Sequence, residues 1–290
     1  MVTHHWRACA GTCALVLVVV CTGPLRAEEI DTEHLFGFTI GSDIGEKGEK
    51  EVESETTPRT GKRAGSYFAL AQQFEFKNTL TNNFRIAAAA VFAYYDIGGL
   101  PDFDDRSRGG FQGLSFDTRF RLIERERASF GLTLSIEPHW NRIDDLTGEL
   151  VENYGGTFTL AADKELIAGK LFAAVNLIYD PEATRVLATN TWMRQSTLGL
   201  SAAVALQVKE GIFLGTELRA FTLCDGLAFD SFAGRALFAG PTLYAKLSER
   251  WWMSVAWNVQ LAGHVVDRPT AFDLVNFERH QAKIRFGYHF

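Results

Sequence analysis

The sequence predicts an all-β protein, folded as an up-and-down antiparallel barrel of about twelve strands. Segments of about 9–13 residues recur along the chain, and in many of them apolar and polar residues alternate, as the two faces of a strand require. The connections between these segments alternate between long and short, as they do when strands run up and down around a barrel. The chain also ends in such a segment.

Each strand is placed by its alternation and by the polar residues that flank it. We expect strands near 34–42, 66–77, 85–95, 111–123, 129–141, 154–164, 171–180, 196–209, 212–222, 235–247, 251–263 and 278–290. The long connections are then 43–65, 96–110, 142–153, 181–195, 223–234 and 264–277. This order puts both termini of the barrel on the side of the short turns.

Alternation alone does not decide which face of the barrel is apolar. A soluble barrel points its apolar face inward and a membrane barrel points it outward, with the same period of two. Aromatic residues favour the membrane arrangement, because they gather near both ends of the expected strands, as in interfacial girdles. The two groups are Tyr94, Trp140, Tyr154 and Tyr179 toward the long loops, and Phe76, Phe130, Trp251 and Phe290 toward the short turns.

The first 27 residues have the pattern of a secretory signal peptide. Arg7 precedes an apolar stretch from Ala14 to Cys21, and Ala27 is the expected cleavage site. The stretch is shorter than the ~20 residues that a membrane-spanning helix needs. We therefore divide the chain into a signal peptide, 1–27, and a single barrel domain, 28–290.

The last nine residues, 282–290, alternate between apolar residues and basic or small ones. Ala282, Ile284, Phe286, Tyr288 and Phe290 share one face, and the chain stops on an aromatic residue. This ending resembles the closing strand of Gram-negative outer-membrane β-barrels. The resemblance implies a transmembrane barrel in the cell outer membrane, with membrane lipid as a partner. It also implies that Phe286, Tyr288 and Phe290 form the signal that the barrel-assembly machinery recognises.

Composition excludes several classes of function. Without the signal peptide the chain carries 27 basic and 35 acidic residues, which argues against nucleic acid as a partner. Cys224 is then the only cysteine, so neither an intrachain disulfide nor a cysteine metal cluster can form. We expect no metal and no cofactor.

One strand carries a possible catalytic group. Glu137, His139 and Asn141 share a face, but neighbours at i and i+2 lie about 6.6–7 Å apart, too far for a direct hydrogen bond. Outer-membrane phospholipases, by the same resemblance, carry His-x-Ser facing lipid, whereas this chain has Asn141 in the serine position. We expect no enzyme here.

The inward face defines the candidate site. The residues that we expect to line the lumen are Arg119, Arg121, Glu137, His139, Glu217, Arg219, Lys283 and Arg285. Two outcomes stay open: opposite charges pair across the barrel and close it, or a basic track favours anionic solutes. Ala87 and Ala89, on the same inward face, leave room for another group to approach.

These observations favour a narrow passive channel for small solutes, similar to a porin. The alternatives are a non-conducting structural or interaction barrel, a barrel with hydrolase activity, and a soluble exported β-barrel.

Overall fold

The computed structural model describes residues 30–101, 103–268 and 270–290, which form one closed barrel of twelve antiparallel strands. Among these residues there is no helix long and apolar enough to cross a membrane. The strands are β1 (Lys50–Thr60), β2 (Ser66–Thr81), β3 (Phe84–Gly98), β4 (Arg106–Ile123), β5 (Gly131–Ile143), β6 (Leu150–Ile167), β7 (Leu171–Val186), β8 (Thr191–Lys209), β9 (Ile212–Asp225), β10 (Ser231–Lys246), β11 (Trp251–Val265) and β12 (His280–His289). The expected signal peptide, 1–27, lies outside the described residues.

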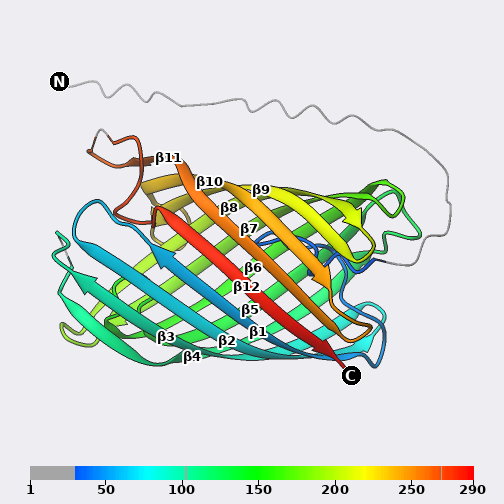
Figure 1. The fold of residues 1–290 in the computed structure, drawn as a ribbon. Helices are drawn as coiled ribbons and strands as arrows, with labels where there is room; N and C mark the ends of the chain where they lie inside the picture. Colours follow the sequence, from blue (N-terminus) through cyan, green and yellow to red (C-terminus); the bar gives the residue numbers. More distant parts are fainter. Residues whose placement is uncertain (1–29, 102, 269) are drawn as a thin grey trace, which may run out of the picture.

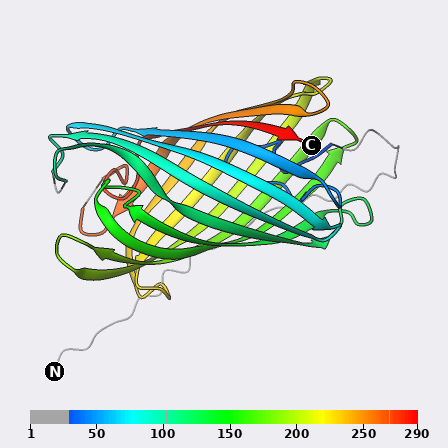
Figure 2. The ribbon, with the colours of Figure 1, turned by 90° about the horizontal axis from the view of Figure 1, so that it is seen from below.

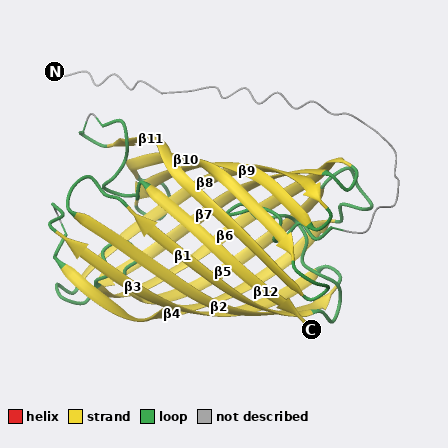
Figure 3. Cartoon of the chain, in the orientation of Figure 1, coloured by secondary structure: helices red, strands yellow, loops and turns green. Residues whose placement is uncertain are grey.

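Each strand pairs with its neighbours in the sequence, and β1 pairs with β12 to close the ring. The closing register runs from Glu51 opposite His289 to Thr60 opposite His280. Figures 1 and 2 show the tilted strands from two sides, and Figure 3 shows strands and loops only in the described chain. The predicted fold class and the number of strands are confirmed.

β1 begins, and β12 ends, at the same end of the barrel, which we call the turn end. The connections there are 82–83, 124–130, 168–170, 210–211 and 247–250. The opposite end, the loop end, carries the connections 61–65, 99–105, 144–149, 187–190, 226–230 and 266–279.

The first predicted strand, 34–42, is wrong, and so is the long connection 43–65. Residues 30–49 lie inside the barrel without strand structure, and the true first strand is β1. Phe36, Phe38 and Ile40 alternate with small residues, which produced a strand-like pattern. The pattern of β1 is weak because only Val52 is strongly apolar on its outward face, opposite the inward-facing Glu51 and Glu53.

Several strands are longer than predicted, at the expense of the long connections. β4 starts at Arg106, β7 runs to Val186, and β8 starts at Thr191, so the connection between β7 and β8 has only the residues 187–190. The long connections 96–110, 181–195 and 223–234 are therefore wrong in part. Tyr94 and Tyr154 lie four residues inside their strands, and the strands continue beyond this aromatic band toward the loop end.

The outward face is apolar and the inward face is polar. Buried residues include charged and amide side chains on the lumen face, such as Asp117, Glu217 and Asn258. Large apolar side chains stand exposed on the opposite face, as in Leu114, Phe116, Leu200, Val204, Leu218, Trp257 and Phe286. Because this is the reverse of a soluble barrel, the exposed band fits contact with hydrocarbon.

Two valines on the outward face of β8 test this band. Val204 lies midway along the apolar stretch, and Val208 lies one residue before the end of the strand. We expect Val204→Arg to lower the free energy of unfolding in lipid vesicles by about 2–4 kcal/mol and Val208→Arg by about 0–1 kcal/mol. Equal losses at the two positions would contradict a membrane-embedded band.

Candidate functional site

Residues 30–49, which we call the inner segment, occupy the lumen. The segment enters from the turn end, passes into the barrel and returns to the same end, where β1 begins (Figure 1). Leu35, Phe36 and Ile44 are buried, and so are the polar Thr32 and Thr39. The lumen is therefore filled in part by the chain's own N-terminal residues.

The first anchor of the inner segment is the carboxylate of Glu33. It accepts hydrogen bonds from Lys77 of β2 at 3.1 Å, from Arg119 of β4 at 3.1 Å, and from Arg85 of β3. Lys77 also donates to Glu53 of β1 at 2.5 Å. Three neighbouring strands thus hold one buried carboxylate.

The second anchor holds the backbone at the deepest part of the segment. The amide N–H groups of Phe38 and Thr39 donate to the Glu217 carboxylate at 2.9 and 3.0 Å. Asn176 of β7 accepts from the N–H of Ile40 and donates to its carbonyl, both at 2.8 Å. From Phe38 to Ile40 lumen side chains satisfy the backbone, whereas at Gly48 and Glu49 the segment bonds the backbone of Thr79 in β2.

The third anchor holds the returning arm. Asp163 of β6 accepts from the N–H of Ser42 at 2.7 Å, and it also pairs with Arg125 at 3.2 Å. Arg125 bridges to Asp43 at 2.9 Å and donates to the carbonyl of Ile30 at 3.0 Å, which joins the two arms of the segment.

Gly37 explains how the segment fits. A Cβ on this residue would lie 2.4 Å from the Cβ of Ala256 and 2.6 Å from Glu217. On the other side, Arg285 of β12 donates to the carbonyls of Phe36 at 2.8 Å and Gly37 at 3.2 Å. Only glycine lets the backbone pass between β11 and the side chains that bind it.

Six of the eight residues expected to line the lumen contact the inner segment. Arg119, Glu217 and Arg285 make the bonds described above. Arg121 donates to the carbonyl of Gly45 at 3.4 Å; the guanidinium of Arg219 lies 3.7 Å from the ring centre of Phe38, and the amine of Lys283 lies 4.9 Å from it. Lys283 also pairs with Glu55 at 2.8 Å, so the cations do not form an unpaired basic track.

Glu137 and His139 lie apart from these contacts, on β5. The Nε2 atom of His139 lies 3.2 Å from the carboxylate of Glu182 of β7, with which it forms a hydrogen bond. Glu182 also accepts from Gln195 at 2.7 Å, so it is part of a polar network across three strands. Glu182 holds the imidazole, and Ser115 of β4 lies opposite His139 in the register of β4 and β5.

The sequence analysis missed Glu33, Lys77 and Arg85. Arg85 had a usable signal, since it lies on the same strand face as Ala87, which the sequence placed on the inward face. Ala87 pairs with Lys77 on one side and Asp117 on the other, which gives these long side chains room. Glu33 had no such signal, because its role depends on a segment that no strand pattern describes.

The loop end is also covered. Tyr67 donates to the carbonyl of Leu146 at 2.9 Å, and Arg59 pairs with Asp145 at 2.6 Å, which draws the connection 144–149 inward. Lys62 donates to the carbonyl of Phe277 at 2.9 Å, and burial lowers the pKa of Lys62 to about 8 against the opposing effect of Glu278. The connection 266–279 is thereby fixed over the opening.

The residues expected to form the assembly signal lie at the other end of the barrel. Phe286 and Phe290 are exposed on the outward face, and Tyr288 packs against Trp251 and Phe290, with ring centres 4.8 and 5.0 Å apart. They join the apolar band at the turn end.

Solved structures share this fold. The COG4313 outer membrane channel from Pseudomonas putida F1 superposes with a TM-score of 0.59 and 14% identity, over 86% of this chain and 98% of that one. The β domain of the Bordetella autotransporter BrkA gives 0.53 and 12%, over 84% and 100%. The NanC porin gives 0.50 and 8%, over 82% and 98%. At these identities the likeness establishes the fold alone.

No curated protein sequence matches the chain. A family profile, described as a family of unknown function, DUF6662, matches residues 28–290, which is the whole expected barrel domain. The chain therefore belongs to the DUF6662 family.

Proposed function

We propose that this protein is an outer-membrane channel for small solutes and that the inner segment closes it. The observation that carries the proposal is the way in which the lumen is filled. The barrel wall holds the inner segment through carboxylates, amides and guanidinium groups, while Leu35 and Phe36 pack in an apolar cluster with wall residues such as Phe172. Two of the similar folds belong to proteins named as a channel and a porin, which supports the same function.

Charged anchors can exchange their partners for water when a plug leaves a barrel, whereas the apolar contacts of Leu35 and Phe36 oppose release. Buried ion pairs contribute little net stability compared with well-packed apolar residues, because each charge loses its hydration on burial. When the inner segment moves out, water can hydrate Lys77, Arg85 and Arg119 on the wall and Glu33 on the segment. The segment is covalently attached to the barrel only through β1, so no strand pair has to break.

A non-conducting structural barrel is the second candidate. It is favoured by the cover at both ends, the inner segment at the turn end and the connections 144–149 and 266–279 at the loop end. In that case the lumen contacts stabilise the barrel and are not released.

Conductance in planar bilayers separates the two candidates. We expect deletion of residues 30–46 to produce open channels in a barrel that otherwise conducts rarely, because the anchors on Glu33, Phe38 and Ser42 are lost together. Folding is checked by the migration of unheated protein in detergent gels. A folded deletion variant that does not conduct would contradict the channel and favour the structural barrel.

A disulfide offers a matched control. A Cβ on Gly131 would lie 3.0 Å from the Cβ of Ser42. This distance is about half an ångström shorter than the usual Cβ–Cβ range of a disulfide, so a small backbone shift would accommodate the bond. In a Cys224→Ser background, Ser42→Cys with Gly131→Cys should suppress the openings of the full-length barrel when oxidised and restore them when reduced. If channel openings are equally frequent in the oxidised and the reduced variant, the current does not require movement of the inner segment.

Ion selectivity tests the lumen residues. Deleting residues 30–46 removes four carboxylates and no lysine or arginine, so the remaining wall gains positive character. We expect the deletion variant to prefer anions weakly under a salt gradient, and Arg119→Gln with Arg285→Gln to reduce that preference. A cation preference, or no shift in the double variant, would exclude these arginines from the selectivity of the pore.

We also propose membrane lipid and the barrel-assembly machinery as partners. The exposed apolar band supports the first, and the terminal aromatic residues Phe286, Tyr288 and Phe290 support the second.

A further inference from the structure

We propose that His34 and His289, with the carboxylates beside them, bind a divalent transition-metal ion such as Zn²⁺ where the inner segment meets the barrel wall. Asp31, His34 and His289 can offer ligand atoms that all lie within 4.8 Å of one another. Glu49 and Glu51 form a second group of this kind with His289. The two groups share His289, and Glu49, 2.8 Å from its Nδ1 atom, is placed to supply a fourth ligand.

The carboxylates around the Nε2 atom of His34 are better suited to a bound metal ion than to a proton on that nitrogen. Its Nε2 atom lies 3.2 Å from Glu51, 3.7 Å from Glu33 and 3.8 Å from Asp31. One N–H serves a single good hydrogen bond, whereas three carboxylates converge on this nitrogen. Oxygen and nitrogen ligands of a tetrahedral Zn²⁺ lie about 3.3–3.5 Å apart, given metal–ligand bonds of about 2.0–2.2 Å. The distances from Nε2 are close to this range, whereas the ligand atoms of the group with His289 are separated by up to 4.8 Å, so His289 would have to move inward to complete the site.

The second nitrogen of His34 supplies an independent observation. Nδ1 is buried and has no hydrogen-bond partner, and the carboxylate of Glu53 lies 3.8 Å from it. A histidine that binds a metal through one nitrogen usually donates the other N–H to a carboxylate. A metal at Nε2 would fix the proton on Nδ1, where a small movement brings it to Glu53. Trp252 stacks on the ring at 3.8 Å and keeps its orientation.

The ligands come from three parts of the chain. Asp31 and His34 belong to the inner segment, Glu49 and Glu51 lie where that segment becomes β1, and His289 ends β12. Even without metal, His289 Nδ1 lies 2.8 Å from Glu49, so the two sides already meet. A bound ion would join the start of the inner segment to the β1–β12 seam and hold the segment in the barrel.

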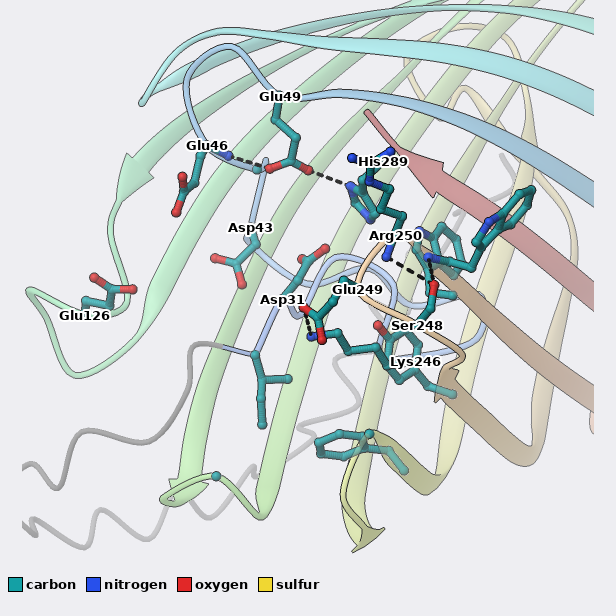
Figure 4. A pocket seen from close by; sticks show the side chains of 18 of the residues that line it. Asp31, Asp43, Glu46, Glu49, Glu126, Lys246, Ser248, Glu249, Arg250 and His289 are labelled. Carbon is teal, nitrogen blue, oxygen red and sulfur yellow. Dashed lines mark hydrogen bonds and ion pairs between the residues drawn. The ribbon is translucent and has the colours of Figure 1, made fainter.

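The site opens toward solvent at the turn end. A cavity of about 1000 Å³ is lined by Asp31, Glu49, Trp252 and His289 among others. Figure 4 shows Asp31, Glu49 and His289 around this cavity, with the interaction between Glu49 and His289 marked. An ion can therefore reach Asp31, Glu49 and His289 from this cavity, while His34 and Glu51 are buried. Imidazole ligands favour Zn²⁺, Ni²⁺ or Cu²⁺ over Ca²⁺ and Mg²⁺.

Calorimetry on the untagged, chelator-treated barrel in detergent tests the proposal, with Zn²⁺ as the probe and Ca²⁺ as the comparison. We expect one Zn²⁺ site per chain, with an affinity at least about tenfold weaker in His289→Gln and in His34→Gln. His139→Gln is the matched control, because His139, Asp180 and Glu182 form a separate group of possible ligands. This control should bind Zn²⁺ as the wild type does.

Glu49→Gln provides a further variant if a histidine substitution prevents folding, and it should also weaken Zn²⁺ binding. Unchanged affinity in His289→Gln, loss of binding in His139→Gln, or a preference for Ca²⁺ would each overturn the proposal. The measurement does not depend on conduction, so the site can hold even if the barrel proves to be structural.

Discussion

The structure depends on one constraint: from Phe38 to Ser42 the backbone of the inner segment lies in the barrel outside the strand ladder, and every buried N–H and C=O group there needs a bond. The wall meets this need with charged and amide side chains placed on separate strands. Glu217 accepts from Phe38 and Thr39, Asn176 serves both groups of Ile40, and Arg285 donates to two consecutive carbonyls. The lumen wall is therefore polar for the same reason that the lumen is filled: its polar side chains bond the backbone of the inner segment.

This constraint also explains why the two open possibilities for the lumen charges do not exclude each other. The cations are paired in the closed barrel, as Lys283 is with Glu55 and Arg119 is with Asp117 and Glu33. Glu33 belongs to the inner segment, however, and would leave with it. The same lumen cations are therefore paired when the inner segment lies in the barrel, and they give the lumen positive character when the segment has left.

The sequence predicted the class of fold and eleven of the twelve strands, because alternation is a local property that each strand shows by itself. The count of twelve strands was right because two errors cancelled. The false strand 34–42 took the place of the true β1, whose outward face is too polar to be recognised. Strand parity also placed Arg119, Glu217 and Arg285 on the same face as the lumen contacts. It could not find their partners, because a bond such as that between Glu33 and Arg85 joins segments 52 residues apart.

Hydrogen exchange measured by mass spectrometry on the barrel in lipid tests the central claim most directly. If lumen side chains hold the inner segment, amides from Phe38 to Ser42 should exchange slowly, while the exposed amide of Lys47 in the same segment exchanges within seconds. Fast exchange throughout residues 30–49, at the rate of the Lys47 amide, would show that the inner segment is not held in the lumen.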